Sequence, residues 1–513
     1  MAASSSSYLS TGNVSAQVFN NGELFTNGDS LGYEVPRGSG KHALEHMGIW
    51  IASATDGDVR EAGTVFGGQS EYNEFWPGPL SGETAPTNCN TFDRIYRVQY
   101  EDDVLAGHAT VRPDVSAWPV NVGAEYDDVN GVPGYQPFDG DTPRMYGDEM
   151  LWWLMNDRGN RHQSTRSDPV GVEVTGMAYV FENPGVLGNT TFYRYEVRNK
   201  NLVSIDSVFI GWKVESRDQQ DWYIGTDTTR GMMYLYSHNS ANEDYGNQPP
   251  AVGVTVLAHS YKEDSRSSVI ERAFSSTMPL YREINLLVFS NYMFQWLTGE
   301  WPFVRYLAPV PQPLVEGGAG GYLRTDSGKE TKFMYPGDPI ESEFWSMMNT
   351  DGEGSTAGIE RQRMLGSIGP FSLAPDEVYT ASIAVVWSQG MDNWDSIRKL
   401  RQDVDFVRGL STVLTTPRPP AKRNPPSLSN DLSWAVYPNP SDGIFEVRVI
   451  VPKPMEVSME LFDVLGRKVH SLHSGVVPIG ETTFSSIPHL PTGTYYLRGK
   501  FDHVVSTRSV VVN

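Results

Sequence analysis

The residues with the clearest chemical potential lie in an acidic loop between residues 127 and 141. Side chains with oxygen ligands recur there at Asp128, Asn130, Asp139 and Asp141. Calcium takes about six to eight oxygen ligands, and a tight loop that contains glycine can aim several oxygens at one point. The favoured interpretation is an acidic surface loop that binds no metal. The alternative is calcium, the one candidate cofactor, bound by these four residues.

Two other patterns contain metal-ligating residue types with less suitable spacing. Asp218, Asp221 and Asp227 belong to a second acidic loop, for which an ordered turn is favoured over a second calcium site. His42 and His46 are four residues apart, as zinc ligands on one helix face would be. The apolar residues around them indicate a strand, on which residues four apart are separated by about 13 Å. We therefore expect no zinc site.

Signatures of nucleophilic catalysis are missing from the sequence. It has no Gly-x-Ser-x-Gly motif and no P-loop, and its single cysteine, Cys89, has no activating partner nearby in sequence. The chain has 62 acidic residues, so pairs of carboxylates are common in its sequence. A glycosidase dyad is defined by the distance between its two carboxyl groups, and counting pairs neither identifies nor excludes one. The pairs Trp152-Trp153 and Phe75-Trp76 could stack on sugar rings, although such aromatics usually belong to the core. We expect no catalytic residues and no enzyme activity.

The composition excludes two classes of partner. The chain has 513 residues and a net charge of −22, which repels nucleic-acid phosphates. No apolar run reaches the roughly 18 residues that a membrane-spanning helix needs. We therefore expect no nucleic-acid partner and no transmembrane segment. The Ser-rich start of the chain lacks the apolar stretch of a signal peptide, which by itself would indicate a cytoplasmic protein.

A mainly β-strand framework must position these residues. Apolar and polar residues alternate in many segments, as in 192–198, and turn-forming residues separate the segments at sandwich-like spacing. We predict an all-β chain with a loop-rich β subdomain at 1–164 and a large antiparallel β-sandwich at 165–412. This body ends in one helix near 393–409. The helix is predicted from apolar residues at helical spacing, namely Ile397, Leu400, Val404 and Val407.

A proline-rich basic linker at 413–433 is predicted to separate the body from a C-terminal module. Five prolines within the ten residues 417–426 disfavour both helix and sheet pairing. The linker carries a charge of +2 and residues 434–513 are neutral. Since the whole chain has a charge of −22, residues 1–412 carry −24. The module consists of short alternating strands between turns, which predicts a small Ig-like β-sandwich.

Four motifs occur in order in this module: Tyr437 to Ser441, Asp463 to Val469, Leu490 to Leu497, and the terminal valines. Together they resemble the type A C-terminal sorting domain of the type IX secretion system of Bacteroidota. The resemblance implies a removed signal peptide, the type IX secretion machinery as a partner, and a location outside the cell or on its outer surface. It leaves open whether the module is cleaved. The sorting-signal residues that it implies are Tyr437, Pro438, Asn439, Pro440, Gly466, Gly493 and Tyr495.

The body contains several further phrases, which are Phe75 to Pro79, Gly147 to Trp153, Pro249 to Gly253, Thr331 to Pro339 and Gly369 to Pro375. They resemble phrases shared by large secreted proteins of the same bacteria, a group without an assigned activity. In those proteins the loop at 127–141 follows a calcium-loop pattern. Val132 and Gln136 stand here where carboxylates would be expected, which implies weaker calcium binding.

These observations predict a secreted, non-catalytic structural protein of the cell surface or extracellular matrix. A β-rich body, a linker and a small sandwich are suited to a homo-oligomer or polymer, such as a filament or a surface layer. The charge of −24 on the body opposes such assembly unless salt or divalent ions screen it. The alternative is a secreted polysaccharide-active hydrolase or carbohydrate-binding protein, because exported proteins with this sorting domain are often hydrolases.

Overall fold

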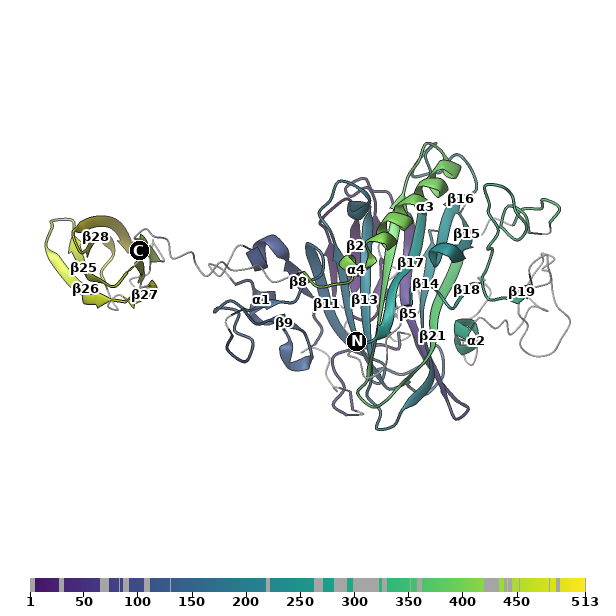
Figure 1. The fold of residues 1–513 in the computed structure, drawn as a ribbon, viewed down its shortest axis with the longest axis horizontal. Coiled ribbons are helices and arrows are strands. Elements are labelled where there is room, and N and C mark those ends of the chain that lie inside the picture. Colours follow the sequence, from purple (N-terminus) through teal and green to yellow (C-terminus); the bar gives the residue numbers. More distant parts are fainter. Residues whose placement is uncertain are drawn as a thin grey trace. The chain divides into compact units, whose positions relative to one another are not determined.

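The protein divides into two compact units, residues 1–420 and residues 421–513, which we call the body and the C-terminal module. Both consist mainly of antiparallel strands (Figure 1), which confirms the predicted all-β class. The computed structural model describes residues 5–26, 32–64, 73–82, 84–85, 92–105, 111–129, 131–217, 222–262, 271–280, 293–298, 323–324, 330–350, 352–357, 362–418, 433–437, 441, 445–451, 453–478, 480–485 and 490–512.

Two large sheets form the body. In spatial order the first contains β1 (Ser6–Leu9), β2 (Ser15–Phe19), β3 (Glu23–Leu24), β5 (Leu44–Thr55), β14 (Ile205–Ser216), β21 (Arg363–Leu373) and β18 (Ser276–Pro279), with β4 (Tyr33–Glu34) beside β2 and β6 (Asp58–Gly63) beside β5. The second contains β15 (Trp222–Asp227), β16 (Met232–Ser237), β17 (Ala251–Tyr261), β22 (Val378–Ser388), β13 (Thr190–Asn199), β12 (Val172–Val180), β11 (Glu149–Asn156) and β7 (Trp76–Pro77), with β8 (Tyr96–Gln99) beside β11.

Alternation along β13 shows how the sequence builds this sandwich. Tyr193 and Tyr195 are fully buried between the sheets, and the rings of Tyr195 and Trp212 of β14 lie 6.2 Å apart. Successive strand residues point to opposite faces, so Arg194 and Glu196 lie on the outer face of the second sheet. Aromatic burial drives the packing on one side, while the other side is left polar.

The two sheets mix strands from both sides of residue 164. In the first sheet β5 pairs with β14, and in the second sheet β11 pairs with β12 along eight residues, from Glu149↔Val180 to Asn156↔Glu173. Residue 164 is therefore not a boundary between packing units, because the interstrand hydrogen bonds and both cores are shared across it.

The predicted helix is α3 (Asn393–Gly409), with its boundaries as expected. Asp392 begins it as the N-cap, because its Oδ1 accepts a hydrogen bond from the Asp395 N–H at 2.8 Å. The apolar face packs on β16, β17 and β22 of the second sheet (Figure 1). Close approach depends on Gly253, where a Cβ would lie 2.5 Å from Met232 Sδ and 3.3 Å from Leu400 Cδ1. The residues buried on this face include all four of the predicted period, Ile397, Leu400, Val404 and Val407.

The start of the predicted linker belongs to the body. A short helix, α4 (Ser411–Leu414), follows α3. Arg418 then donates its backbone N–H to the Met145 carbonyl oxygen at 2.7 Å and its guanidinium to Asp148 Oδ1 at 2.6 Å. The same guanidinium lies 4.1 Å from the ring centroid of Tyr100. The boundary predicted at residue 413 is corrected accordingly, because ion pairing and cation–π contact hold the chain to the body through Arg418.

Short elements complete the body: α1 (Pro113–Ser116), α2 (Met293–Thr298), the hairpin strands β9 (Tyr126–Asp127) and β10 (Thr142–Pro143), the pair β19 (Leu323–Arg324) and β20 (Glu330–Thr331), the π-helical turn Tyr100–Leu105, and 3₁₀ turns at Val120–Val122, Val186–Asn189 and Thr228–Arg230. Among the described residues, none of the helices combines the length and apolar character needed to span a membrane.

The C-terminal module has two small sheets. One contains β23 (Ser433–Tyr437), β24 (Glu446–Val451) and β27 (Gly480–Ser485), and the other contains β26 (Lys468–Val477), β25 (Met455–Asp463), β28 (Gly493–Phe501) and β29 (Val504–Val512). β28 alternates strictly between buried and exposed residues, and Tyr495, Leu497 and Phe501 enter one apolar core with residues of β24 and β25. A small antiparallel sandwich results, as predicted.

Candidate functional site

The acidic loop at 127–141 is held mainly by bonds within the protein. The carboxylate of Asp141, which is buried, accepts backbone N–H groups of Val129 at 3.0 Å and Gln136 at 2.8 Å. Asp128 accepts the Gly131 N–H at 2.7 Å, while Asp128 and Asp139 are exposed. Within the described ranges no three His, Cys, Asp or Glu side chains gather closely enough to hold a metal ion. Asn130 lies outside the described residues, and calcium binding stays a prediction.

The second acidic loop, Cys89 and the aromatic pairs are the other candidates from the sequence. Residues 218–221 and Cys89 lie outside the described residues, whereas Asp227 caps the 3₁₀ turn that follows β15 by accepting the N–H groups of Thr229 and Arg230. Burial raises the pKa of Asp227, but hydrogen bonds from Thr229 and Arg230 outweigh it, and the pKa is lowered. Trp152, Trp153 and Phe75 are buried in the core, as predicted, and Trp76 is half-buried.

His46 belongs to a buried ion cluster of the first sheet. It lies on β5, as the strand prediction required, with its Nδ1 4.0 Å from Glu215 Oε1. Glu215 also pairs with Arg363 at 2.9 Å and with Lys213 on its own strand. Burial raises the pKa of the nearby Glu23 to about 7, although a hydrogen bond from Asn21 and the charge of Lys213 lower it. The cations and carboxylates of the cluster contact one another, which is typical of structural ion pairs.

Replacing Glu23 by glutamine is expected to flatten the pH dependence of stability. The pKa of Glu23 is about 7 in the folded state and 4.5 ordinarily. Between pH 4.5 and pH 7, the carboxyl group of Glu23 therefore holds a proton in the folded state that it has lost in the unfolded state. The contribution of Glu23 to the free energy of unfolding is therefore fully present below about pH 4.5 and lost as pH rises to 7, by on the order of 3 kcal/mol. Urea unfolding at pH 5 and pH 7.5 measures this. An unchanged pH slope in Glu23→Gln, relative to the exposed control Glu182→Gln, would refute it.

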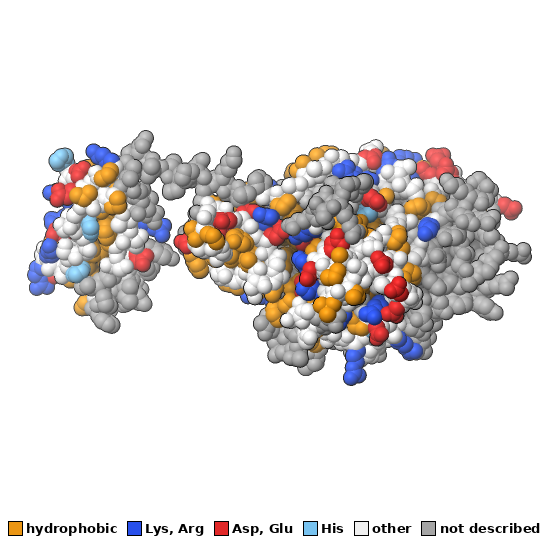
Figure 2. All heavy atoms as spheres, turned by 60° about the horizontal axis from the view of Figure 1, so that its bottom comes forward, with side chains coloured by type: hydrophobic (Ala, Val, Ile, Leu, Met, Phe, Trp, Pro, Cys, Tyr) orange, Lys and Arg blue, Asp and Glu red, His pale blue; other side chains and the backbone are white. Residues whose placement is uncertain are grey.

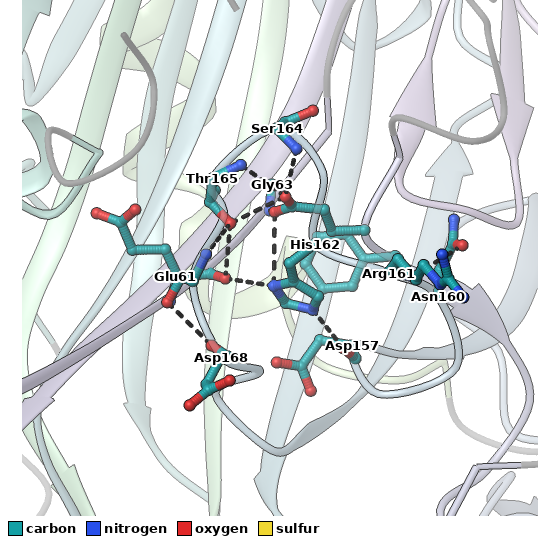
Figure 3. A network of polar contacts seen from close by, with 12 residues as sticks. Glu61, Gly63, Asp157, Asn160, Arg161, His162, Ser164, Thr165 and Asp168 are labelled. Atoms are coloured by element: carbon teal, nitrogen blue, oxygen red, sulfur yellow. Dashed lines mark hydrogen bonds and ion pairs between the residues drawn. The ribbon is translucent and has the colours of Figure 1, made fainter. Parts of the chain in front are cut away.

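A second buried network joins the two sheets at one edge, around His162 (Figure 3). Its Nδ1 lies 2.7 Å from the Glu61 carbonyl oxygen of β6, and its Nε2 lies 2.6 Å from the Asp157 carbonyl oxygen after β11. A carbonyl oxygen can only accept, so this arrangement is satisfied by a ring that donates from both nitrogens. The carboxylate of Glu74 lies 3.8 Å from Nδ1 and balances the charge of such a ring.

Glu74 connects the segments that meet in this network. Its Oε1 accepts the N–H groups of Ser164 and Thr165 at 3.1 and 2.8 Å and the Thr165 hydroxyl at 2.9 Å, and its Oε2 accepts the Gly63 N–H at 2.9 Å. Burial raises the pKa of Glu74, while His162 and the donors lower it; the pKa remains raised overall. Both ring nitrogens of His162 and both carboxylate oxygens of Glu74 are engaged by contacts within the protein, which makes the role of the network structural.

An accessible pocket lies on the outer face of the second sheet, beyond the end of α3. Strand register creates its floor: Arg194 of β13, Ser382 of β22 and Ala258 of β17 form one row, and Glu196, Thr380 and Ser260 form the next. The cavity measures about 240 Å³. Its lining residues are Arg194, Ala258, His259, Ser260, Tyr261, Lys262, Arg272, Thr380, Ser382, Thr412, Thr415 and Thr416. Eleven of the twelve side chains carry a polar or charged group, with Ala258 as the exception, so the pocket suits a polar ligand.

The hydroxyl groups on the floor have unused hydrogen-bonding capacity. Thr380 is 7% exposed and Ser382 is 0% exposed, and neither hydroxyl has a hydrogen-bond partner among the described residues. An unpaired buried hydroxyl costs about 1–3 kcal/mol, which a ligand or water that bonds to it would recover. The rim is contributed by Thr412 and Thr416, which are exposed, so the cavity runs from solvent to a buried polar floor.

A ladder of alternating charges connects the pocket to the hairpin at 126–143. Lys262 donates to Glu196 at 2.6 Å and to Glu125 at 2.8 Å, and Arg194 contacts Glu196 at 3.0 Å. Arg144 continues the ladder to Glu125 at 3.2 Å. Burial raises the pKa of Glu125, but Lys262 and Arg144 outweigh it, and the pKa is lowered. Spacing along the chain gave no sign of this arrangement, because it joins four separate segments.

The sorting-signal residues have structural places in the C-terminal module. Gly466 has a φ of +75° in the turn after β25, a conformation that glycine adopts without strain. The Tyr495 hydroxyl donates to the Pro491 carbonyl oxygen at 2.9 Å and closes the turn before β28, which begins at Gly493. Tyr437 ends β23. Pro438, Asn439 and Pro440 lie outside the described residues.

Comparison with known proteins identifies the C-terminal module. Residues 435–513 match the family model described as the secretion system C-terminal sorting domain. The chain is therefore exported by type IX secretion to the extracellular space or the outer cell surface. No curated protein matches the chain. A solved chain described as a polysaccharide lyase is 9% identical to this chain, with a TM-score of 0.19. The match covers 68% of this chain and 35% of the lyase chain, so this chain spans about a third of the length of the lyase chain. A likeness of that size carries no argument about the body.

Proposed function

We propose that this exported chain is a non-catalytic, carbohydrate-binding protein of the extracellular surface, and that its body holds one sugar unit in the pocket beyond α3. The observation that carries the proposal is the pair of buried hydroxyls, Thr380 and Ser382, at the base of an open polar cavity. Sugars present hydroxyls that can donate to and accept from such groups. A volume of about 240 Å³ is below the 300–1,000 Å³ of sites for drug-sized ligands, which suits a single sugar.

The charges beside the pocket support binding without hydrolysis. A glycosidase needs one carboxyl group with a raised pKa as the acid and a second carboxylate as nucleophile or base. Glu196 and Glu125 are the carboxylates in contact with Lys262, and its ammonium bonds to both. The pKa of Glu125 is lowered by its partners, which is opposite to what a general acid requires. Ion pairing thus occupies both groups.

Blocking the rim is expected to abolish sugar binding without affecting the fold. Thr412 lines the rim and is exposed, so Thr412→Trp places a large ring over the opening. The neighbouring Val413 is 70% exposed and does not line the pocket, which makes Val413→Trp the matched control. Binding of the full chain to a glycan panel measures the effect. Loss of binding in Thr412→Trp alone supports the proposal; equal binding by both variants, or no glycan bound by the native chain, refutes it.

Self-assembly into filaments or a surface layer stays a prediction. It requires contacts between copies of the chain, and the contacts described above all lie within one copy.

A further inference from the structure

The pocket is lined by one lysine and two arginines, which differ in how their charges are balanced. Arg194 and Lys262 are paired with Glu196, and Lys262 also with Glu125. Arg272 is exposed, and its guanidinium donates to the Thr412 hydroxyl at 3.3 Å. Among the described residues it has no carboxylate within ion-pair distance. Arg272 is therefore the cation of the rim that is available to an incoming anion.

A second unpaired guanidinium stands behind Arg272. Arg408, in the last turn of α3, donates from Nη1 to the carbonyl oxygens of Arg272 and Val256, each at 2.8 Å. These acceptors are neutral, and Arg408 likewise has no ion pair within the described part of the chain. Burial lowers the pKa of Arg408, and the positive charge of Arg272 lowers it further. The charges of Asp405 and Asp227 act on Arg408 in the opposite direction, and Glu271 lies 3.8 Å from His259 in the pocket wall. The charge offered to a ligand at the rim is therefore that of Arg272 itself, which acts at short range.

The wider surface of the body is mixed in sign. Figure 2 shows acidic and basic side chains interspersed over the described part of one face. The body as a whole is strongly acidic, so an anionic ligand is repelled at long range. Beyond the Debye length of about 8–10 Å at ordinary salt this repulsion is screened, and the groups in direct contact decide affinity.

We propose that the pocket is selective for an anionic sugar, one that bears a carboxylate or a sulfate, with Arg272 as the partner of the anionic group and the hydroxyls of Thr380 and Ser382 as partners of the ring hydroxyls. The inference rests on the proposed sugar-binding function and adds the charge of the ligand to it. A guanidinium binds carboxylate and sulfate through paired N–H donors, and hydrogen bonds between ionised groups are the stronger class. The Thr412 hydroxyl, already in contact with Arg272, orients the guanidinium at the rim.

Calorimetric titration of the full chain tests this inference with four probes. These are D-glucuronate, galactose 6-sulfate, uncharged glucose, and sodium acetate or sulfate as free anions. The anionic sugars are expected to bind roughly tenfold to a hundredfold more tightly than glucose, the range of one charged hydrogen bond. Free anions are expected to bind weakly, because they lack the ring hydroxyls. Raising the salt concentration should weaken the binding of the anionic sugars and leave the binding of glucose unchanged.

Two charge-removing variants separate the role of Arg272 from a general charge effect. Arg272→Gln is expected to remove the difference in affinity between glucuronate and glucose, both measured with the same variant. Arg166→Gln removes the same charge from an exposed residue that does not line the pocket, and should leave both affinities unchanged. Both positions are exposed, so both variants are expected to fold, which their melting temperatures check.

The outcomes distinguish the two levels of the proposal. Equal affinity for glucuronate and glucose, both lost in Thr412→Trp, would overturn anion selectivity and leave sugar binding in place. Selectivity that survives in Arg272→Gln would overturn the role of Arg272. Free anions bound as tightly as anionic sugars would show a simple anion site and overturn both. Absence of binding by every probe would also overturn both.

Discussion

Replacing Glu74 by alanine is expected to destabilise the body by about 3–5 kcal/mol, the usual cost of breaking a buried charge network. The substitution leaves the backbone N–H groups of Gly63, Ser164 and Thr165 without their acceptor. It also leaves the buried ring of His162 without the carboxylate 3.8 Å from it. Chemical unfolding monitored by tryptophan fluorescence measures the change in the free energy of unfolding.

A double-mutant cycle shows whether Glu74 and His162 act as one unit. Glu74→Ala combined with His162→Ala is expected to cost less than the sum of the single changes by about 1 kcal/mol or more, because residues in one network couple. Glu182→Ala, at an exposed carboxylate with no side-chain partner among the described residues, is the control and should change stability by less than about 0.5 kcal/mol. An effect of Glu74→Ala as small as the control would contradict the structural role of the network.

Removing the C-terminal module is expected to abolish export and leave the body folded. A chain that ends at residue 420 retains α4 and the contacts of Arg418 with Asp148 and Tyr100. The body and the module are separate compact units, so the melting temperature of the body should not change. The sorting domain at 435–513 is lost, and the shortened chain should remain cell-associated. Fractionation of a bacterium with type IX secretion, followed by immunoblotting, measures export.

Two point substitutions test whether the folded module is what the secretion system requires. Leu497 is 0% exposed in the core of the module, and Val505 on the adjacent strand β29 is 58% exposed. Leu497→Asp is expected to block export, because a buried charge without a partner unfolds a small sandwich. Val505→Asp introduces the same charge at the surface and should be exported. Export of the Leu497→Asp chain at the native level would contradict a requirement for the folded module.

Sequence patterns predicted the elements whose burial repeats locally. The apolar period of α3 appears directly in the sequence, and the predicted boundaries of the helix agree with the structure. The alternation at 192–198 likewise matches β13, with the tyrosines inside and the charged residues outside. Sorting motifs were recognisable because they combine turn residues and strands within short segments. The boundary expected at 164 failed because interstrand pairing is not local and continues across it.

Tertiary structure alone brought together the pocket and the buried networks. Arg194, Ala258 and Ser382 are separated along the chain, and only the register of β13, β22 and β17 aligns them in one row. Glu74 and His162 meet because β6 and the connection after β11 converge at one edge of the sandwich. The period of the apolar residues indicates which face of each helix or strand is buried, because every residue on the buried face tends to be apolar. Which faces meet depends on pairing between distant strands, so the position of the site was decided by the fold.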